Sequence, residues 1–229
     1  MKKILFLFCL AVGISSVSLA QSPALFVKGG VNFGNITTDK DGNVDDANTR
    51  TSFHVGLQGD LPITRFFAIQ PAVLFTGKGS KLEVGNTSGD NWMRSSTNPY
   101  YIEVPVNAVI KVPLGEETAL FIGAGPYAAV GVGGKNRIEG EVLGVDFSRT
   151  DKIKFSNDDP FTSGEEGAGY GVMRRFDYGL NGTAGLQANR FLISANYGLG
   201  LAKLQSGTSS SDDELGKHRV FSLTVGVRL

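Results

Sequence analysis

The sequence predicts an all-β protein, an eight-stranded antiparallel up-and-down barrel that crosses a membrane. Three observations lead to this prediction. Strand-like segments alternate between an apolar and a polar side, long polar connections alternate with short ones, and Gly makes up 31 of 229 residues, about twice its average usage of ~7%. A Gly-rich chain can be disordered, but here the glycines interrupt strongly alternating apolar segments, which favours β-structure.

The first residues have the pattern of a targeting segment. Lys2 and Lys3 precede an apolar stretch that runs to about Ile14, and small residues follow up to Ala20. This order predicts a secretory signal peptide over residues 1–20 and a mature barrel domain over residues 21–229. A membrane-anchoring helix is less favoured, because the apolar run is shorter than the ~20 residues that a spanning helix needs.

The composition argues against several classes of function. Lys and Arg together number 22, as do Asp and Glu, so the chain lacks the basic excess of a nucleic-acid-binding protein. The single cysteine, Cys9, lies inside the predicted signal peptide, so we expect no disulfide or thiol chemistry in the mature chain. No later apolar run is long enough for a membrane-spanning helix, so a membrane role requires a β-barrel.

Eight segments show the period of two that is typical of β-strands. In the segment 100–114, Ile102 and Val104 fall on an apolar side, whereas Glu103 and Lys111 fall on the other side. The predicted strands are 24–34, 51–60, 66–76, 99–112, 118–132, 175–187, 191–203 and 218–229. The strand 118–132 is the least regular, because glycines separate Phe121 from Tyr127.

The connections between these strands alternate in length. The tight connections are 61–65, 113–117 and 188–190, and the long polar ones are 35–50, 77–98, 133–174 and 204–217. Four long connections at one end and three turns at the other predict a transmembrane barrel with long external loops and short periplasmic turns.

A soluble eight-stranded barrel would also alternate, but with its apolar side inward. Two features favour the membrane barrel. The polar side is mostly Gly, Ala, Ser, Thr and Asn, which suits a narrow lumen better than a soluble exterior. The aromatic residues of the apolar side gather at the strand ends, which predicts two interfacial belts. They are Phe67 and Phe191 near the turns, and Phe33, Phe75, Tyr100, Phe176, Tyr178 and Phe221 near the loops.

This orientation places Glu103 and Lys111 inside the barrel. A slip of one residue would turn both into lipid, where a mid-bilayer Lys alone costs ~2–4 kcal/mol. Inside, they can pair with charged residues such as Lys28, Asp60, Asp177 or Arg228. Because an eight-stranded lumen is just wide enough for side chains, we expect a plug of polar contacts and no open pore.

Five segments carry a resemblance to a known family. They are VKGGVNFGN (27–35), FFAIQPAVLFTGKG (66–79), YIEVPVNAVIKV (101–112), FIGAGPYAAVGVGG (121–134) and FDYGLNGTAGLQ (176–187). In this order the chain resembles the PorT-like outer-membrane β-barrel family of Gram-negative bacteria, with the OmpA/OmpX type of barrel. It departs from many outer-membrane barrels in ending on Leu229 where Phe is common. The resemblance implies a location more firmly than an activity, since some members resemble secretion accessories.

The sequence can be examined for the residues that catalysis on lipid would need. Small outer-membrane barrels include lipid A acyltransferases and deacylases, which need a base near a nucleophile or water. Only His54 and His218 could serve as the base, with Ser52 or Ser222 as partner, and we interpret them instead as structural interior residues.

The acidic segment DKDGNVDD (39–46) suggests a calcium site, but it lacks the Gly and the bidentate Glu that an EF-hand loop requires, because Val44 and Arg50 stand there. Weak surface binding of a metal ion stays open for four carboxylates, Asp39, Asp41, Asp45 and Asp46.

We therefore expect a non-enzymatic, monomeric barrel without cofactor or dedicated metal, with any specificity in its external loops. The loop 133–174 is the foremost candidate for binding an extracellular or secretion-system protein, and the alternative is that it is a passive surface loop. Within it, residues 136–155 alternate as an extended β-ribbon would, and the acidic, Gly-rich segment 156–171 should be mobile. The alternatives are an outer-membrane enzyme acting on lipid or lipopolysaccharide and a small solute channel.

Overall fold

The computed structural model describes residues 22–36, 49–85, 91–115, 117–142, 144–155, 172–202 and 217–229, and these residues form β-strands and their connections. The long strands are β1 (Ala24–Ile36), β2 (Arg50–Pro62), β3 (Phe67–Gly77), β5 (Asn91–Pro113), β6 (Thr118–Val142), β10 (Phe176–Ala188), β11 (Phe191–Gly200) and β12 (His218–Arg228). The short strands are β4 (Ser80–Gly85), β7 (Val145–Lys152), β8 (Lys154–Phe155) and β9 (Val172–Met173). Within these residues there is no helix that is long and apolar enough to cross a membrane.

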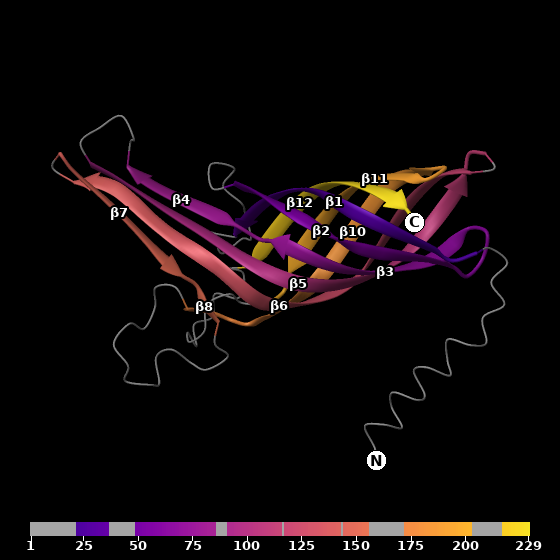
Figure 1. The fold of residues 1–229 in the computed structure, drawn as a ribbon, viewed down its shortest axis with the longest axis horizontal. Helices are drawn as coiled ribbons and strands as arrows, with labels where there is room; N and C mark the ends of the chain where they lie inside the picture. Colours follow the sequence, from indigo (N-terminus) through magenta and orange to yellow (C-terminus); the bar gives the residue numbers. More distant parts are fainter. Residues whose placement is uncertain are drawn as a thin grey trace, which may run out of the picture.

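The eight long strands form a closed antiparallel ring. Their order is β1, β2, β3, β5, β6, β10, β11 and β12, and β12 returns to β1 with Val31 opposite Leu223. Figure 1 shows these strands wrapping around a common axis. The predicted eight-stranded barrel is therefore confirmed, and each predicted strand overlaps one strand of the ring.

The connections at one end of the barrel are short, as predicted. Residues 63–66, 114–117 and 189–190 join β2 to β3, β5 to β6 and β10 to β11. The shortest of these three connections reverses direction at Asn189. This residue has a φ of 51°, a left-handed conformation that Asn tolerates better than most residues.

The segments 77–98 and 133–174, predicted as long polar connections, contain more strand than the sequence indicated outside the expected ribbon 136–155. β5 and β6 continue well past the barrel, β4 pairs with the extension of β5, and β7 pairs with the extension of β6. We call this four-stranded extension the distal sheet: β4, β7, residues 91–98 of β5 and residues 134–142 of β6. It is the arm at the left of Figure 1. The expected ribbon over 136–155 is confirmed, with Gly144 (φ 77°) at its turn.

The apolar side of the strands faces outward. In β5, Ile102, Val104 and Val106 are 38%, 43% and 40% exposed, whereas Asn107 and Lys111 of the other side are 5% and 7% exposed. The remaining strands of the ring follow the same pattern. Exposed apolar side chains over a whole barrel surface are stable only against lipid, so this arrangement agrees with a membrane barrel.

Both expected aromatic belts are present. Near the long connections, Phe33 stacks on Phe221 with ring centroids 6.3 Å apart, and Phe75 stacks on Tyr100 at 5.3 Å. At the opposite end, Phe66, Phe67 and Phe191 are 57%, 36% and 63% exposed. Aromatic side chains at both strand ends mark the two levels at which hydrocarbon meets the interface.

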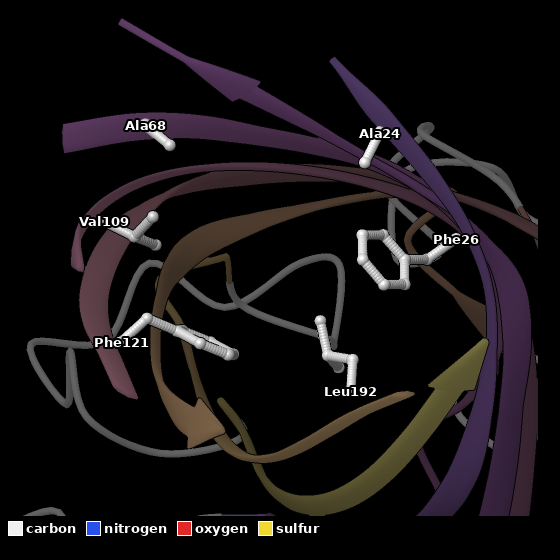
Figure 2. Packing of buried hydrophobic residues seen from close by; sticks show 6 residues of the cluster. All are labelled: Ala24, Phe26, Ala68, Val109, Phe121 and Leu192. Atoms are coloured by element: carbon white, nitrogen blue, oxygen red, sulfur yellow. The ribbon is translucent and has the colours of Figure 1, made fainter. Parts of the chain in front are cut away.

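An apolar plug fills the turn end of the barrel interior. It consists of Ala24, Phe26, Ala68, Val109, Phe121 and Leu192, all of them buried. Figure 2 shows these side chains pointing into the interior from strands around the ring. The prediction of a lumen filled by polar contacts is therefore incomplete, because apolar side chains such as Phe26 (0% exposed) and Phe121 (4% exposed) fill much of one end.

Candidate functional site

The two charges inside the segment 100–114 both point into the lumen and both have partners, as predicted. Lys111 forms an ion pair with Asp60 of β2, and Gln70 donates a hydrogen bond of 3.1 Å to the same carboxylate. The Lys111 and Asp60 side chains are 9% and 3% exposed, so water screens this pair weakly. This group lies at the level of the apolar plug, since Ala24 is the register partner of Asp60.

Glu103 pairs with a residue that the sequence analysis left in a loop. Its Oε2 lies 2.6 Å from Nζ of Lys78, which follows directly after β3. Asp177 of β10 approaches the same Nζ at 2.8 Å, and the ammonium lies 4.0 Å from the ring centroid of Tyr127. A buried Lys is tolerated because two carboxylates and an aromatic face replace the water it loses.

His54 is a structural residue in the middle of the lumen. Its Nδ1 lies 2.7 Å from Oδ1 of Asn32, and its Nε2 lies 3.0 Å from Oγ1 of Thr224. Because a carbonyl oxygen only accepts, Nδ1 carries the proton and Nε2 accepts from the Thr224 hydroxyl. Ser52 instead donates to the Gly77 carbonyl at 2.7 Å, so the structure does not bring His54 and Ser52 together as base and nucleophile.

Ser222 is also occupied elsewhere. Its hydroxyl donates to Oδ1 of Asn32 at 2.8 Å, and Nδ2 of Asn32 donates to Oγ1 of Thr76 at 2.9 Å. Closer to the apolar plug, Nζ of Lys28 donates a hydrogen bond of 2.7 Å to Oε1 of Gln58. The interior polar residues thus form a hydrogen-bonded network that holds strands from opposite parts of the chain, as a filled lumen requires.

His218 closes the other end of the lumen. It is 1% exposed, its ring meets Tyr101 edge to face at 5.8 Å, and the ring of Phe155 of β8 also packs on Tyr101, at 5.7 Å. Neither ring nitrogen of His218 has a hydrogen-bond partner among the described residues. We call Lys78, Tyr101, Glu103, Tyr127, Asp177 and His218 the mouth cluster.

The space left between the mouth cluster and the plug is small. A cavity of about 50 Å³ lies among Lys28, Asn32, His54 and Glu103. Drug-sized ligands need ~300 Å³ or more, whereas a water molecule needs only ~10–15 Å³, so this cavity suits a few waters. This cavity is too small to serve as a substrate pocket.

The distal sheet presents two chemically different faces. One face continues the lumenal side of β5 and β6 and carries Met93 and Phe147, which are 41% and 39% exposed. The other face continues the lipid-facing side and carries Arg94, Arg137 and Glu139, with ion pairs of 3.3 Å from Arg94 to Glu139 and 2.8 Å from Arg137 to Glu139. Every residue of β7 is exposed, so its outer edge is a solvent-accessible strand edge.

Several predicted features lie outside the described residues. They are the signal peptide 1–20, the acidic segment with Asp39, Asp41, Asp45 and Asp46, and the segment 156–171. Among the residues that the structure does describe, His, Cys, Asp and Glu form no group of three or more that could hold a metal ion.

Comparison with known proteins identifies the type of domain. Residues 19–206 match the family model for the outer membrane protein β-barrel domain. The crystal structure of Ail, the attachment invasion locus protein of Yersinia pestis, aligns over 91% of this chain and 100% of that chain, with 16% identity and a TM-score of 0.42. The crystal structure of Neisserial surface protein A aligns over 91% and 99%, with 12% identity and a TM-score of 0.40. A search of curated proteins finds no match.

Proposed function

Because the chain belongs to the outer membrane protein β-barrel domain family, we propose that it is a non-enzymatic outer-membrane protein whose function resides in the distal sheet. Outer-membrane barrels keep periplasmic turns short and place long connections outside the cell, so the distal sheet should face the exterior. The barrel then acts as the anchor and the sheet as the functional part.

One observation carries this proposal: β5 and β6 each continue as one strand from the barrel wall into the distal sheet, with a β-bulge in their pairing between Tyr100 and Tyr101. They are 23 and 25 residues long, far beyond the ~9–11 residues that a membrane-spanning strand needs. Two continuous strands flanked by β4 and β7 form a stiff platform rather than a set of separate loops. A rigid exposed platform lowers the entropic cost of holding a partner.

The face with Met93 and Phe147 is the proposed site for a protein partner. Exposed apolar side chains beside the free edge of β7 suit either side-chain packing or addition of a strand. The five segments that resemble PorT-like barrels support a secretion-accessory role for such contacts. We also propose that residues 1–20 direct export and are removed after Ala20.

An enzyme and a solute channel are less well supported. Both nitrogens of His54 are used in structural hydrogen bonds, and His218 lies against Tyr101 rather than a serine. The apolar plug and the mouth cluster fill the two ends of the lumen.

The test is site-specific photo-crosslinking in the native cells. A photoreactive residue at Phe147 or Met93 should give a discrete protein adduct, and the same residue at Ile122, which faces lipid, should give none. Heat-modifiable migration would verify that each variant is folded. Folded Phe147 and Met93 variants that yield no adduct would contradict the proposed function.

A further inference from the structure

The lipid-facing side of the barrel continues directly into one face of the distal sheet. Tyr100 lies in the aromatic belt, in contact with Phe75, and its register partner on β6 is Gly133. Two residues further from the barrel, on the same side of the strands, stand Asn98 and Lys135. The first row beyond the belt therefore belongs to the membrane side of the sheet.

This row and the next one carry basic residues. Lys135 is paired in register with Lys152 of β7, and both are exposed. In the second row Arg137 is paired with Ser96, whose partner on β4 is Lys81. We call Lys81, Lys135, Arg137 and Lys152 the basic face.

Acidic residues on this side begin only further out. Glu139 lies in the third row and Glu141 and Asp146 in the fourth. Arg94 is the register partner of Glu139 in the third row, so the two rows nearest to the barrel carry basic residues alone and acidic residues join them only further out. Uniform solvation does not favour cations in one row over another. Contact with anions at one height above the barrel does favour cations at that height.

The level of the basic face matches that of lipid headgroups. A strand rises ~3.4 Å per residue, so the two basic rows lie about 7 and 14 Å along the strand beyond Tyr100. With a strand tilt of ~35–45°, this corresponds to heights of roughly 5 and 10 Å. The interfacial layer on each side of a bilayer is ~5–8 Å thick, so the first row lies within it and the second at its edge.

We propose that the basic face binds the phosphate groups of outer-leaflet lipids whose headgroups carry net negative charge, such as lipid A, and holds the distal sheet down on the membrane surface. Arg137 uses one nitrogen in its ion pair with Glu139 and can donate from its other nitrogens to a phosphate, and the exposed Lys135 and Lys152 add positive charge around it. The face with Met93 and Phe147 then points away from the lipid. This inference needs no protein partner, so it can fail or hold independently of the proposed function.

Trp92 provides an internal probe. It is the single tryptophan of the chain, and it lies on the same side as the basic face, in the row of Glu141 at the far end of the sheet. We would reconstitute the full-length mature protein in vesicles of phosphatidylcholine, with and without lipid A, and measure quenching of its fluorescence by acrylamide. Trp92 lies eight residues beyond Tyr100, about 27 Å along the strand, so the sheet must bend toward the membrane at the β-bulge beside Tyr100 and Tyr101 for Trp92 to reach the surface. In the docked sheet, lipid A should therefore lower the quenching constant, and high salt should restore it.

Two arginines form a matched pair of variants. Arg137 and Arg149 are both exposed, and each pairs with an acidic residue two positions further along its own strand, at 2.8 Å to Glu139 and 2.7 Å to Asp151. They lie on opposite faces of the sheet, because Arg149 is paired in register with Ile138. Arg137→Glu should abolish the protection of Trp92, and Arg149→Glu should leave it intact.

A second variant guards against a local defect at Arg137. Lys152→Glu changes a residue of the basic face on β7, whereas Arg137 lies on β6. This variant should also reduce the protection of Trp92 from acrylamide and should keep its heat-modifiable migration. Equal quenching with and without lipid A in the unaltered protein would overturn the proposal. So would an equal loss of protection in Arg137→Glu and Arg149→Glu, or full protection in both Arg137→Glu and Lys152→Glu.

Discussion

Lys78 and Glu103 form a buried ion pair of 2.6 Å, although Lys78 lies just beyond the end of β3 and Glu103 lies within β5. Asp177 of β10 shares the same ammonium group at 2.8 Å. One cation therefore joins three parts of the chain at the outer end of the lumen. The Lys78 and Asp177 side chains are only 4% and 1% exposed, so their charges depend on each other rather than on water.

Removing this cation should cost more than removing one of its carboxylates. Lys78→Met leaves Glu103 and Asp177 without a counter-charge and should lower the free energy of unfolding by ~3–5 kcal/mol. Glu103→Gln keeps the pair of Lys78 with Asp177 and should cost about 1–3 kcal/mol. Urea unfolding in lipid vesicles measures both, with the outward-facing Ile102→Leu as a nearly silent control. A larger loss in Glu103→Gln than in Lys78→Met would contradict the shared-cation geometry.

The orientation of β5 predicts a depth-dependent cost of charge on its outer side. Val104 lies midway between the belts and is 43% exposed, so Val104→Lys should destabilise the barrel by ~2–4 kcal/mol. Val112 lies beyond Ile110, the register partner of the belt residue Phe67, so Val112→Lys should cost ~0–1 kcal/mol. Equal unfolding midpoints for the two variants in vesicles would mean that this side of the strand does not meet lipid.

The apolar plug should contribute stability without acting alone as the seal of the lumen. Phe121→Ala leaves a void among buried side chains and should cost ~3–5 kcal/mol, whereas Leu120→Ala should cost less because lipid fills the space outside. Single-channel recordings of Phe121→Ala in planar bilayers should show no conductance, since the mouth cluster still closes the other end. Steady conductance in this variant would show that the plug is the only barrier.

Much of the barrel could be predicted because period-two alternation is strong where one side meets lipid. Ile102 and Glu103 cannot exchange sides without burying a charge in hydrocarbon, so residue type alone indicated their orientation. The same constraint is weak beyond the belts. Ser95, Ser96 and Thr97 are acceptable on either face of a solvated sheet, and their alternation gave no sign that β5 continues outward.

The interior contacts were harder to predict, for two physical reasons. Lys78 meets Glu103 and Asp177 through the register of separate strands, which no local pattern encodes. The apolar plug did leave a signal that was overlooked: four strands carry three successive apolar residues near the turn end, which alternation alone does not explain. These triplets are 25–27, 108–110, 120–122 and 191–193.

The exposed apolar surface of the barrel leads to a prediction about the conditions under which the chain folds. With residues such as Ile122 and Val225 64% and 62% exposed around the whole ring, the mature chain should fold only in detergent or lipid. A folded barrel should also migrate differently on gels before and after boiling. Recovery of a soluble, monomeric, β-rich protein without detergent would contradict the membrane barrel.

The orientation of the barrel in the membrane can be tested by proteolysis of intact cells. Arg149, Lys152 and Lys154 are exposed near the edge of the distal sheet, and Arg65 is exposed in the short connection between β2 and β3. If the long connections face outward, trypsin added to intact cells should cut within 149–154 and spare Arg65, because the outer membrane shields the periplasmic end. Edge strands open locally more readily than the barrel wall, which makes β7 the better substrate once it is reached. Permeabilising the outer membrane should add cleavage at Arg65 and thereby show that this site is cleavable. Cleavage of intact cells at Arg65 but not within 149–154 would invert the topology and remove the distal sheet from the cell surface.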